Sequence, residues 1–147
     1  MSQNKRLFVA INVSDLMVSN FQPFLKKLKI GADQREIDLR WTVPENYHVT
    51  LSFIGNRNIT EIPEFYSALE EAAKSFPAFN LKMEDVSAFP NETAGRVIYV
   101  GVQAKKILQN LKAKIDQELM AANLIAEVED FTFIPHLTIA RLRNPQH

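Results

Sequence analysis

Apolar residues along the chain recur with two different periods, which predicts strands alternating with helices. Continuous or alternating apolar runs predict strands at 7–13, 39–43, 48–54, 79–86 and 96–103, and a last strand from 133 or 136 to 142. Helical spacing predicts helices from Ser14 or Asp15 to Gly31, at 61–76 and at 105–122. We expect Gly55-Asn56 to end the third strand and residues 90–95 to form a loop.

The order of elements contains a repeat. The first strand, its helix and the 48–54 strand make one β-α-β unit. The 96–103 strand, the third helix and the last strand make another. The units share little sequence except one tripeptide, His-x-Thr. Two copies of one unit commonly pack about a pseudo-twofold axis, and we expect the equivalent strands to face each other.

The shared tripeptide places matching polar groups on the second strand of each unit. It occurs as His48-Val49-Thr50 and as His136-Leu137-Thr138. Because residues i and i+2 of a strand point to one face, each histidine shares a face with its threonine. The apolar residue between them points the other way. Each strand therefore buries one face and presents an imidazole and a hydroxyl on the other.

Two imidazoles at matching positions suit acid–base chemistry at phosphorus. Imidazole titrates near neutral pH, so one copy can accept a proton while the other donates one. In-line displacement needs these groups on opposite sides of the phosphorus. Each proton transfer is worth roughly 10²–10⁴ in rate. Thr50 and Thr138 would donate to the phosphate oxygens on which charge develops.

Other uses of histidine fit less well. A single strand histidine is usually a hydrogen-bonded structural residue, and only the repetition favours a functional pair. The sequence has no His-x-x-x-His motif and no carboxylate in register with either tripeptide, so nothing indicates a metal site. The third histidine, His147, is the last residue. We therefore expect neither a metal nor another cofactor.

Composition narrows the class of partner. The chain has 147 residues and a formal net charge of zero, so non-specific binding to a nucleic-acid backbone should be weak. Any nucleic-acid role must rest on a local site. There are no cysteines, which excludes thiolate nucleophiles. No apolar run is long enough for a membrane span or a secretory signal, so we expect a cytoplasmic location and no membrane partner.

With these motifs, the chain resembles the 2H phosphoesterase superfamily, and within it the RNA 2′,3′-cyclic phosphodiesterases, also called 2′-5′ RNA ligases. The resemblance covers nearly the whole chain. It is carried by Arg6–Ile11, by Tyr47–Gly55 around the first tripeptide, by Phe89-Pro90 with Gly95–Gly101, and by Pro135–Arg141 around the second.

The resemblance implies a fold and a reaction. The fold would be α+β, a two-lobed pseudo-symmetric duplication of the β-α-β unit, with antiparallel sheets around a central cleft. The lobes would share that cleft within one domain spanning 1–147. The reaction would be metal-independent opening of a terminal 2′,3′-cyclic phosphate on RNA to a 2′-phosphate. His48 would be the proton donor and His136 the proton acceptor, although symmetry alone allows the exchange. Reverse 2′-5′ joining of RNA ends would be a side activity.

Two further residues are expected to bind substrate. The resemblance implies that Arg141 contacts phosphate, yet strict alternation from His136 puts it on the wrong face unless the strand bulges. Phe8 shares a face with Ala10 and Asn12 and could stack a base. The alternative for Arg141 is a solvated or structural arginine, and for Phe8 an ordinary place in the core.

The sequence leaves alternatives open for the substrate and for the class of protein. The same chemistry could act on small cyclic nucleotides or 2′-5′ oligonucleotides, which net neutrality slightly favours. A non-catalytic RNA- or nucleotide-binding domain is the other reading, but such a domain needs no second proton-transfer group. We expect RNA ends or nucleotides as partners, no obligatory protein partner, and a monomer.

Overall fold

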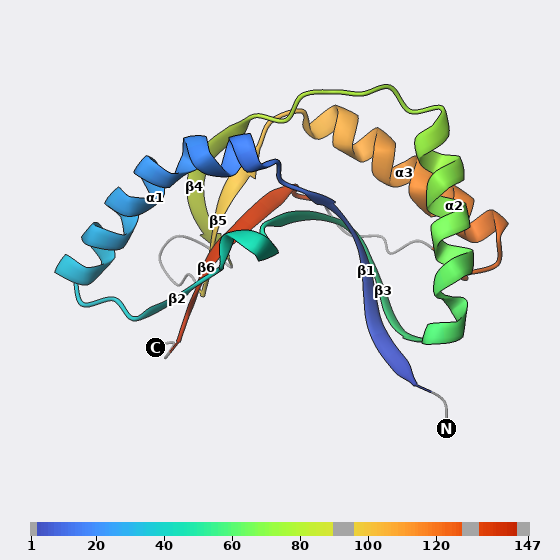
Figure 1. Cartoon of the computed structure of the whole chain (residues 1–147), viewed down its shortest axis with the longest axis horizontal. Helices are drawn as coiled ribbons and strands as arrows, with labels where there is room; N and C mark the ends of the chain where they lie inside the picture. Colours follow the sequence, from blue (N-terminus) through green and yellow to red (C-terminus); the bar gives the residue numbers. More distant parts are fainter. Residues whose placement is uncertain (1–2, 90–95, 128–132, 144–147) are drawn as a thin grey trace. The chain divides into compact units, whose positions relative to one another are not determined.

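The chain alternates strands with helices largely as the apolar pattern predicts (Figure 1). The computed structural model describes residues 3–89, 96–127 and 133–143, so the predicted loop at 90–95 and His147 lie outside it. Its strands are β1 Asn4–Asn12, β2 Leu39–Trp41, β3 His48–Asn58, β4 Met83–Phe89, β5 Val97–Val102 and β6 His136–Leu142. Its helices are α1 Asp15–Gln34, α2 Ile62–Lys74 and α3 Lys105–Ala121, with short 3₁₀ turns at Pro44–Asn46 and Ile59–Glu61.

Several predicted boundaries are wrong: β1 begins at Asn4 instead of Leu7, β2 ends at Trp41 instead of Val43, and α1, β3 and β4 also differ. Helix α1 is capped by the Ser14 side chain as expected, but it runs through Gly31 to Gln34. Strand β3 runs through Gly55, whose φ of +99° suits a residue without a side chain, to Asn58. Strand β4 begins at Met83, four residues after the predicted start at Phe79. In α1 and β3 the local stop signal of a glycine was outweighed by the packing of the longer element.

The chain divides into two compact units, each assembled from distant segments. Unit 1 contains Met1–Ala10, Thr50–Lys82 and Gln103–Pro135; unit 2 contains Ile11–Val49, Met83–Val102 and His136–His147. Strands hydrogen-bond in the order β1-β3-β6-β5-β4. Strand β2 also pairs with β6, on the edge that faces away from β5 and that also pairs with β3. The pairs β2·β6, β3·β6, β5·β6 and β4·β5 are antiparallel. The α+β class is therefore confirmed.

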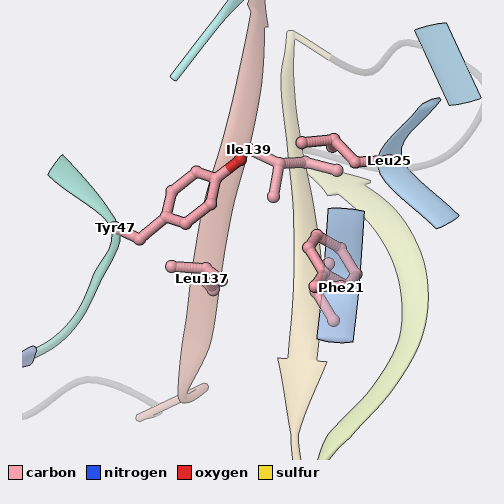
Figure 2. Close-up of a cluster of buried hydrophobic side chains, with 6 residues drawn as sticks. Phe21, Leu25, Tyr47, Leu137 and Ile139 are labelled. Carbon is pink, nitrogen blue, oxygen red and sulfur yellow. The ribbon is translucent and has the colours of Figure 1, made fainter. Parts of the chain in front are cut away.

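In unit 2, helix α1 covers one face of the sheet. Its core consists of Phe21, Leu25, Tyr47, Val100, Leu137 and Ile139, with Trp41 and Ile98 packed against it. Figure 2 shows Leu25 of the helix beside Ile139 of β6, Phe21 further along the same helix, and the Tyr47 ring near both Leu137 and Ile139. The Tyr47 ring is 3% exposed, and burial raises the pKa of its hydroxyl. One face of β6 is thus committed to the core, which leaves the other for polar residues.

In unit 1, helices α2 and α3 pack side by side. Their apolar faces bury Phe65, Ala68 and Ala72 from α2, and Leu108, Ile115 and Leu119 from α3. A polar cluster ties β3 to α3: Ser52 Oγ donates to Asp116 Oδ1 at 2.7 Å, and Lys112 Nζ donates to Asp116 Oδ2 at 2.9 Å. Lys112 also donates to Ser52 Oγ at 3.1 Å, so the buried carboxylate is paired with a cation and a hydroxyl.

Candidate active site

The open face of the unit 2 sheet carries the second tripeptide. Leu137 pairs with Val100 in the core, so His136 and Thr138 point to the opposite face, where they lie across from Gly101 and Tyr99. His136 is partly exposed. The structure therefore supports the predicted alternation of this motif.

Two aromatic rings pack against the His136 imidazole. The centroids of Phe89 and His136 are 4.9 Å apart, and those of Tyr99 and His136 are 5.3 Å apart, each pair edge to face. Phe89 and Tyr99 stack on each other at 4.3 Å. These three rings brace one another, so the orientation of the imidazole is fixed by packing. Sequence reasoning gave Phe89 and Tyr99 no role, although both lie in the segments that carried the family resemblance.

One register contact brings the first histidine to the same sheet. Val49 of β3 pairs with Leu137 of β6 in antiparallel register. One step away, His48 comes opposite Thr138, with Cβ atoms about 4.5–5.5 Å apart in such pairs. His48 and His136 are then diagonal neighbours, at about 7–8 Å. Alternation along the two strands therefore puts both histidines on one face of the sheet.

A backbone carbonyl orients the His48 ring. The distance from His48 Nδ1 to the Asn46 carbonyl oxygen is 2.6 Å. A carbonyl can only accept, so Nδ1 carries a proton and donates it there. Any proton exchanged with a substrate would then be carried by Nε2. Asn46 ends the 3₁₀ turn that begins at Pro44, so this turn helps to set the direction of the imidazole.

A bulge in β6 resolves the position of Arg141. Tyr99 of β5 pairs with Thr138, but the next step of β5, Ile98, pairs with Ala140, so Ile139 is an extra residue. Ile139 and Ala140 are both fully buried. Arg141 then pairs with Val97, which shares a face of β5 with Tyr99. Arg141 therefore lies on the face of His136 and Thr138, and the expectation from strict alternation is wrong.

The first motif repeats the burial of the second. From His48 to Ile54 and from His136 to Leu142, the classes run in the same order: intermediate, buried, intermediate, buried, buried, exposed, intermediate. Thr50 thus corresponds to Thr138, and Phe53 to Arg141. The repeat predicted from sequence has a structural counterpart along these seven residues.

Thr50 and Phe8 belong to unit 1. Thr50 is partly exposed and follows His48 by two residues in β3. Phe8 of β1 is 47% exposed and its ring lies 6.3 Å from that of Phe53, which is 61% exposed. Phe8 is therefore not the ordinary core residue that was its alternative reading.

Residues 3–89, 96–127 and 133–143 contain no group of three or more His, Cys, Asp or Glu able to hold a metal ion. No helix in these same ranges has the length and apolar character needed to cross a membrane.

The chain is similar in sequence to known phosphoesterases. A family model described as LigT like Phosphoesterase matches residues 17–99. The RNA 2′,3′-cyclic phosphodiesterase of Archaeoglobus fulgidus is 31% identical over 143 residues, which are 96% of this chain and 76% of that protein. The protein of the same name from Methanothermobacter thermautotrophicus is 25% identical, over 97% of this chain and 73% of that one.

Solved structures share the fold. The protein TT0787 of Thermus thermophilus has a TM-score of 0.79 at 23% identity, covering 97% of this chain and 77% of that chain. E. coli LigT complexed with 3′-AMP has a TM-score of 0.67 at 18% identity, covering 95% and 74%. Together with the family match and the sequence relatives, these similarities show that the chain belongs to the LigT-like phosphoesterase family.

Proposed function

We propose that the protein is a metal-independent RNA 2′,3′-cyclic phosphodiesterase, which hydrolyses a terminal 2′,3′-cyclic phosphate to a 2′-phosphate. The observation that supports this proposal is the antiparallel pairing of Val49 with Leu137, from which we infer that His48 and His136 share one face of a sheet. The names of the sequence relatives supply the substrate class.

In the proposed reaction, His136 takes a proton from water as the water oxygen attacks phosphorus. His48 gives the proton on Nε2 to the 3′ oxygen as the bond between that oxygen and phosphorus breaks. A 2′-phosphate and a 3′-hydroxyl result, and the two histidines have exchanged protonation states. The carbonyl of Asn46 and the rings of Phe89 and Tyr99 support the two imidazoles in these roles.

The remaining predicted residues bind substrate in this scheme. Thr138 and Thr50 donate hydroxyl hydrogen bonds to the phosphate oxygens, on which negative charge grows in the transition state. Arg141 offers a guanidinium, which can match two oxygens of a substrate phosphate group at once, whether of the cyclic phosphate or of its neighbour along the chain. Phe8 stacks a nucleobase. Reversal of the reaction, with a 5′-hydroxyl in place of water, would give 2′-5′ ligation.

The test is hydrolysis of an oligonucleotide that ends in a 2′,3′-cyclic phosphate, with the product end identified. We expect a 2′-phosphate, and turnover that survives a chelator. A 3′-phosphate product would contradict the assignment of the leaving oxygen. Turnover of mononucleotides alone would favour the small-nucleotide alternative, and binding without turnover of any cyclic phosphate would favour a non-catalytic domain.

A further inference from the structure

Two arginines lie directly opposite each other beside the candidate active site. Arg40 of β2 pairs with Arg141 of β6 in antiparallel register. Directly paired residues point to the same face, so Arg40 joins Arg141 on the face of His136 and Thr138. Both arginines are exposed. The neighbouring pair supports this orientation, because Trp41 lies opposite Ala140 and packs against the core on the other face.

The strand neighbours of this pair do not balance its charge. Like charges opposite each other on neighbouring strands destabilise a sheet. The acidic residue next along this face is Asp38, which is already paired with Arg143 at 3.5 Å. On the other side, Arg141 faces the apolar Val97. At the described ends of β2 and β6, Arg40, Arg141 and Arg143 thus accompany only Asp38, and a bound anion would relieve the repulsion.

The spacing indicates which anion. Thr138 and Arg141 pair with Tyr99 and Val97, two residues apart on β5, which corresponds to about 7 Å. That separation is comparable to the span between neighbouring phosphates of one RNA strand. With the cyclic phosphate at His136 and Thr138, the arginine pair is placed to receive the next phosphate along the chain.

We propose that Arg40 and Arg141 together bind the phosphodiester adjacent to the terminal cyclic phosphate, so that the enzyme prefers oligonucleotides to mononucleotides. This inference rests on the proposed function. It explains how a chain with zero net charge recognises RNA, because the charge is concentrated at one position rather than spread over the surface.

The experiment combines a protein change with a substrate change. A dinucleotide ending in a 2′,3′-cyclic phosphate is made with either a phosphodiester or a neutral methylphosphonate between its nucleotides. In the wild-type enzyme, the methylphosphonate should lower kcat/KM by about tenfold, the loss of one charge-assisted contact. Arg40→Gln should cause a similar loss on the phosphodiester and little further loss on the methylphosphonate, since both changes remove one interaction.

Salt dependence and a matched variant provide the controls. Arg40→Gln should reduce the slope of log kcat/KM against log salt by about 0.7, as expected for one phosphate contact on a single strand. Arg35→Gln removes the same charge from the end of α1, where Arg35 donates to the Gly31 carbonyl, and should leave the substrate preference unchanged.

The outcomes separate this inference from the proposed function. If the methylphosphonate still lowers kcat/KM of Arg40→Gln by tenfold, the two changes act independently, and this result would overturn the arginine site. Equal wild-type turnover of both dinucleotides would also overturn it, and this arm decides the matter even if the variant does not fold. Wild-type enzyme that hydrolyses neither dinucleotide nor any mononucleotide would contradict the proposed function itself.

Discussion

Val49 lies opposite Leu137 in adjacent antiparallel strands, and this one pair sets the register of both His-x-Thr motifs. Each residue is almost fully buried between its histidine and its threonine in sequence. Because side chains alternate along a strand, burying these two residues turns both imidazoles to the opposite face. The hydrophobic core thus decides on which face of the sheet the two imidazoles stand.

Tyr99→Leu tests whether the ring pair positions His136. We expect kcat to fall roughly 10–100-fold, because the imidazole loses the ring that fixes its orientation. Tyr99→Phe keeps the ring and should keep kcat close to that of the wild type. The measurements are kcat, KM and the NMR shifts of the His136 ring protons, which lie in the ring currents of Tyr99 and Phe89. Unchanged kcat and shifts in Tyr99→Leu would show that the packing has no influence on the imidazole.

Phe8→Leu tests base stacking. The ring is 47% exposed on β1, and a base stacked on an aromatic residue contributes about 1–3 kcal/mol. KM for a cyclic-phosphate substrate should therefore rise, while Phe8→Tyr should retain the wild-type value. Phe24→Leu on α1, where the ring is 43% exposed, is the matched control. A KM in Phe8→Leu equal to that of the control would exclude stacking at this ring.

Asp116→Ala tests the buried cluster of unit 1. The Asp116 and Lys112 side chains are 6% and 13% exposed, so removing the carboxylate leaves an almost buried cation without its partner. We expect the free energy of unfolding in urea to fall by about 3–5 kcal/mol. Replacing both residues, as Lys112→Met with Asp116→Leu, should cost much less. Glu71→Ala, in an exposed pair, should cost under about 1 kcal/mol. A small loss in Asp116→Ala would mean that water reaches Lys112.

Tyr47→Phe tests the one buried side-chain atom without a hydrogen-bond partner in the described part of the chain, the Tyr47 hydroxyl. Removing it should raise the free energy of unfolding at neutral pH, by about 1–3 kcal/mol. Burial raises the pKa of this hydroxyl in the folded state, so the unfolded state loses its proton first as pH rises above about 10. Stability should therefore fall in alkali in the wild type and fall less in Tyr47→Phe.

Urea unfolding at neutral and alkaline pH measures both effects. Tyr66→Phe is the control, because that ring is 68% exposed on α2. A lower stability of Tyr47→Phe at neutral pH would mean that the hydroxyl has a partner in solution, such as a bound water.

The sequence was sufficient for features that depend on local periodicity. Both His-x-Thr strands and the helix cap at Ser14 follow from alternation and capping, whereas the α+β class came from the resemblance to a known family. The bulge at Ile139 does not, because an extra residue in a strand leaves no periodic signal, and it changes the face on which Arg141 lies. Counting alternate residues along the strand therefore gave the wrong face for Arg141, the residue that was expected to bind phosphate.

The sequence also did not reveal which distant segments pack together. Helix α1 follows β1 in sequence but packs in unit 2, against Leu137 and Ile139 of the last strand. The pairing of Arg40 with Arg141 and the rings around His136 likewise join segments far apart in the chain. Such contacts depend on strand order, which the period of a single segment does not reveal.

Hydrolysis by single histidine variants is the most direct test of the two-histidine mechanism. Wild type, His48→Ala and His136→Ala are compared on an oligonucleotide ending in a 2′,3′-cyclic phosphate, with a chelator present and over a range of pH. We predict chelator-resistant turnover with a bell-shaped pH dependence in the wild type, and at least a roughly 100-fold loss of kcat in each folded variant. Near-wild-type turnover in either variant, or loss of wild-type activity in the chelator, would contradict the account.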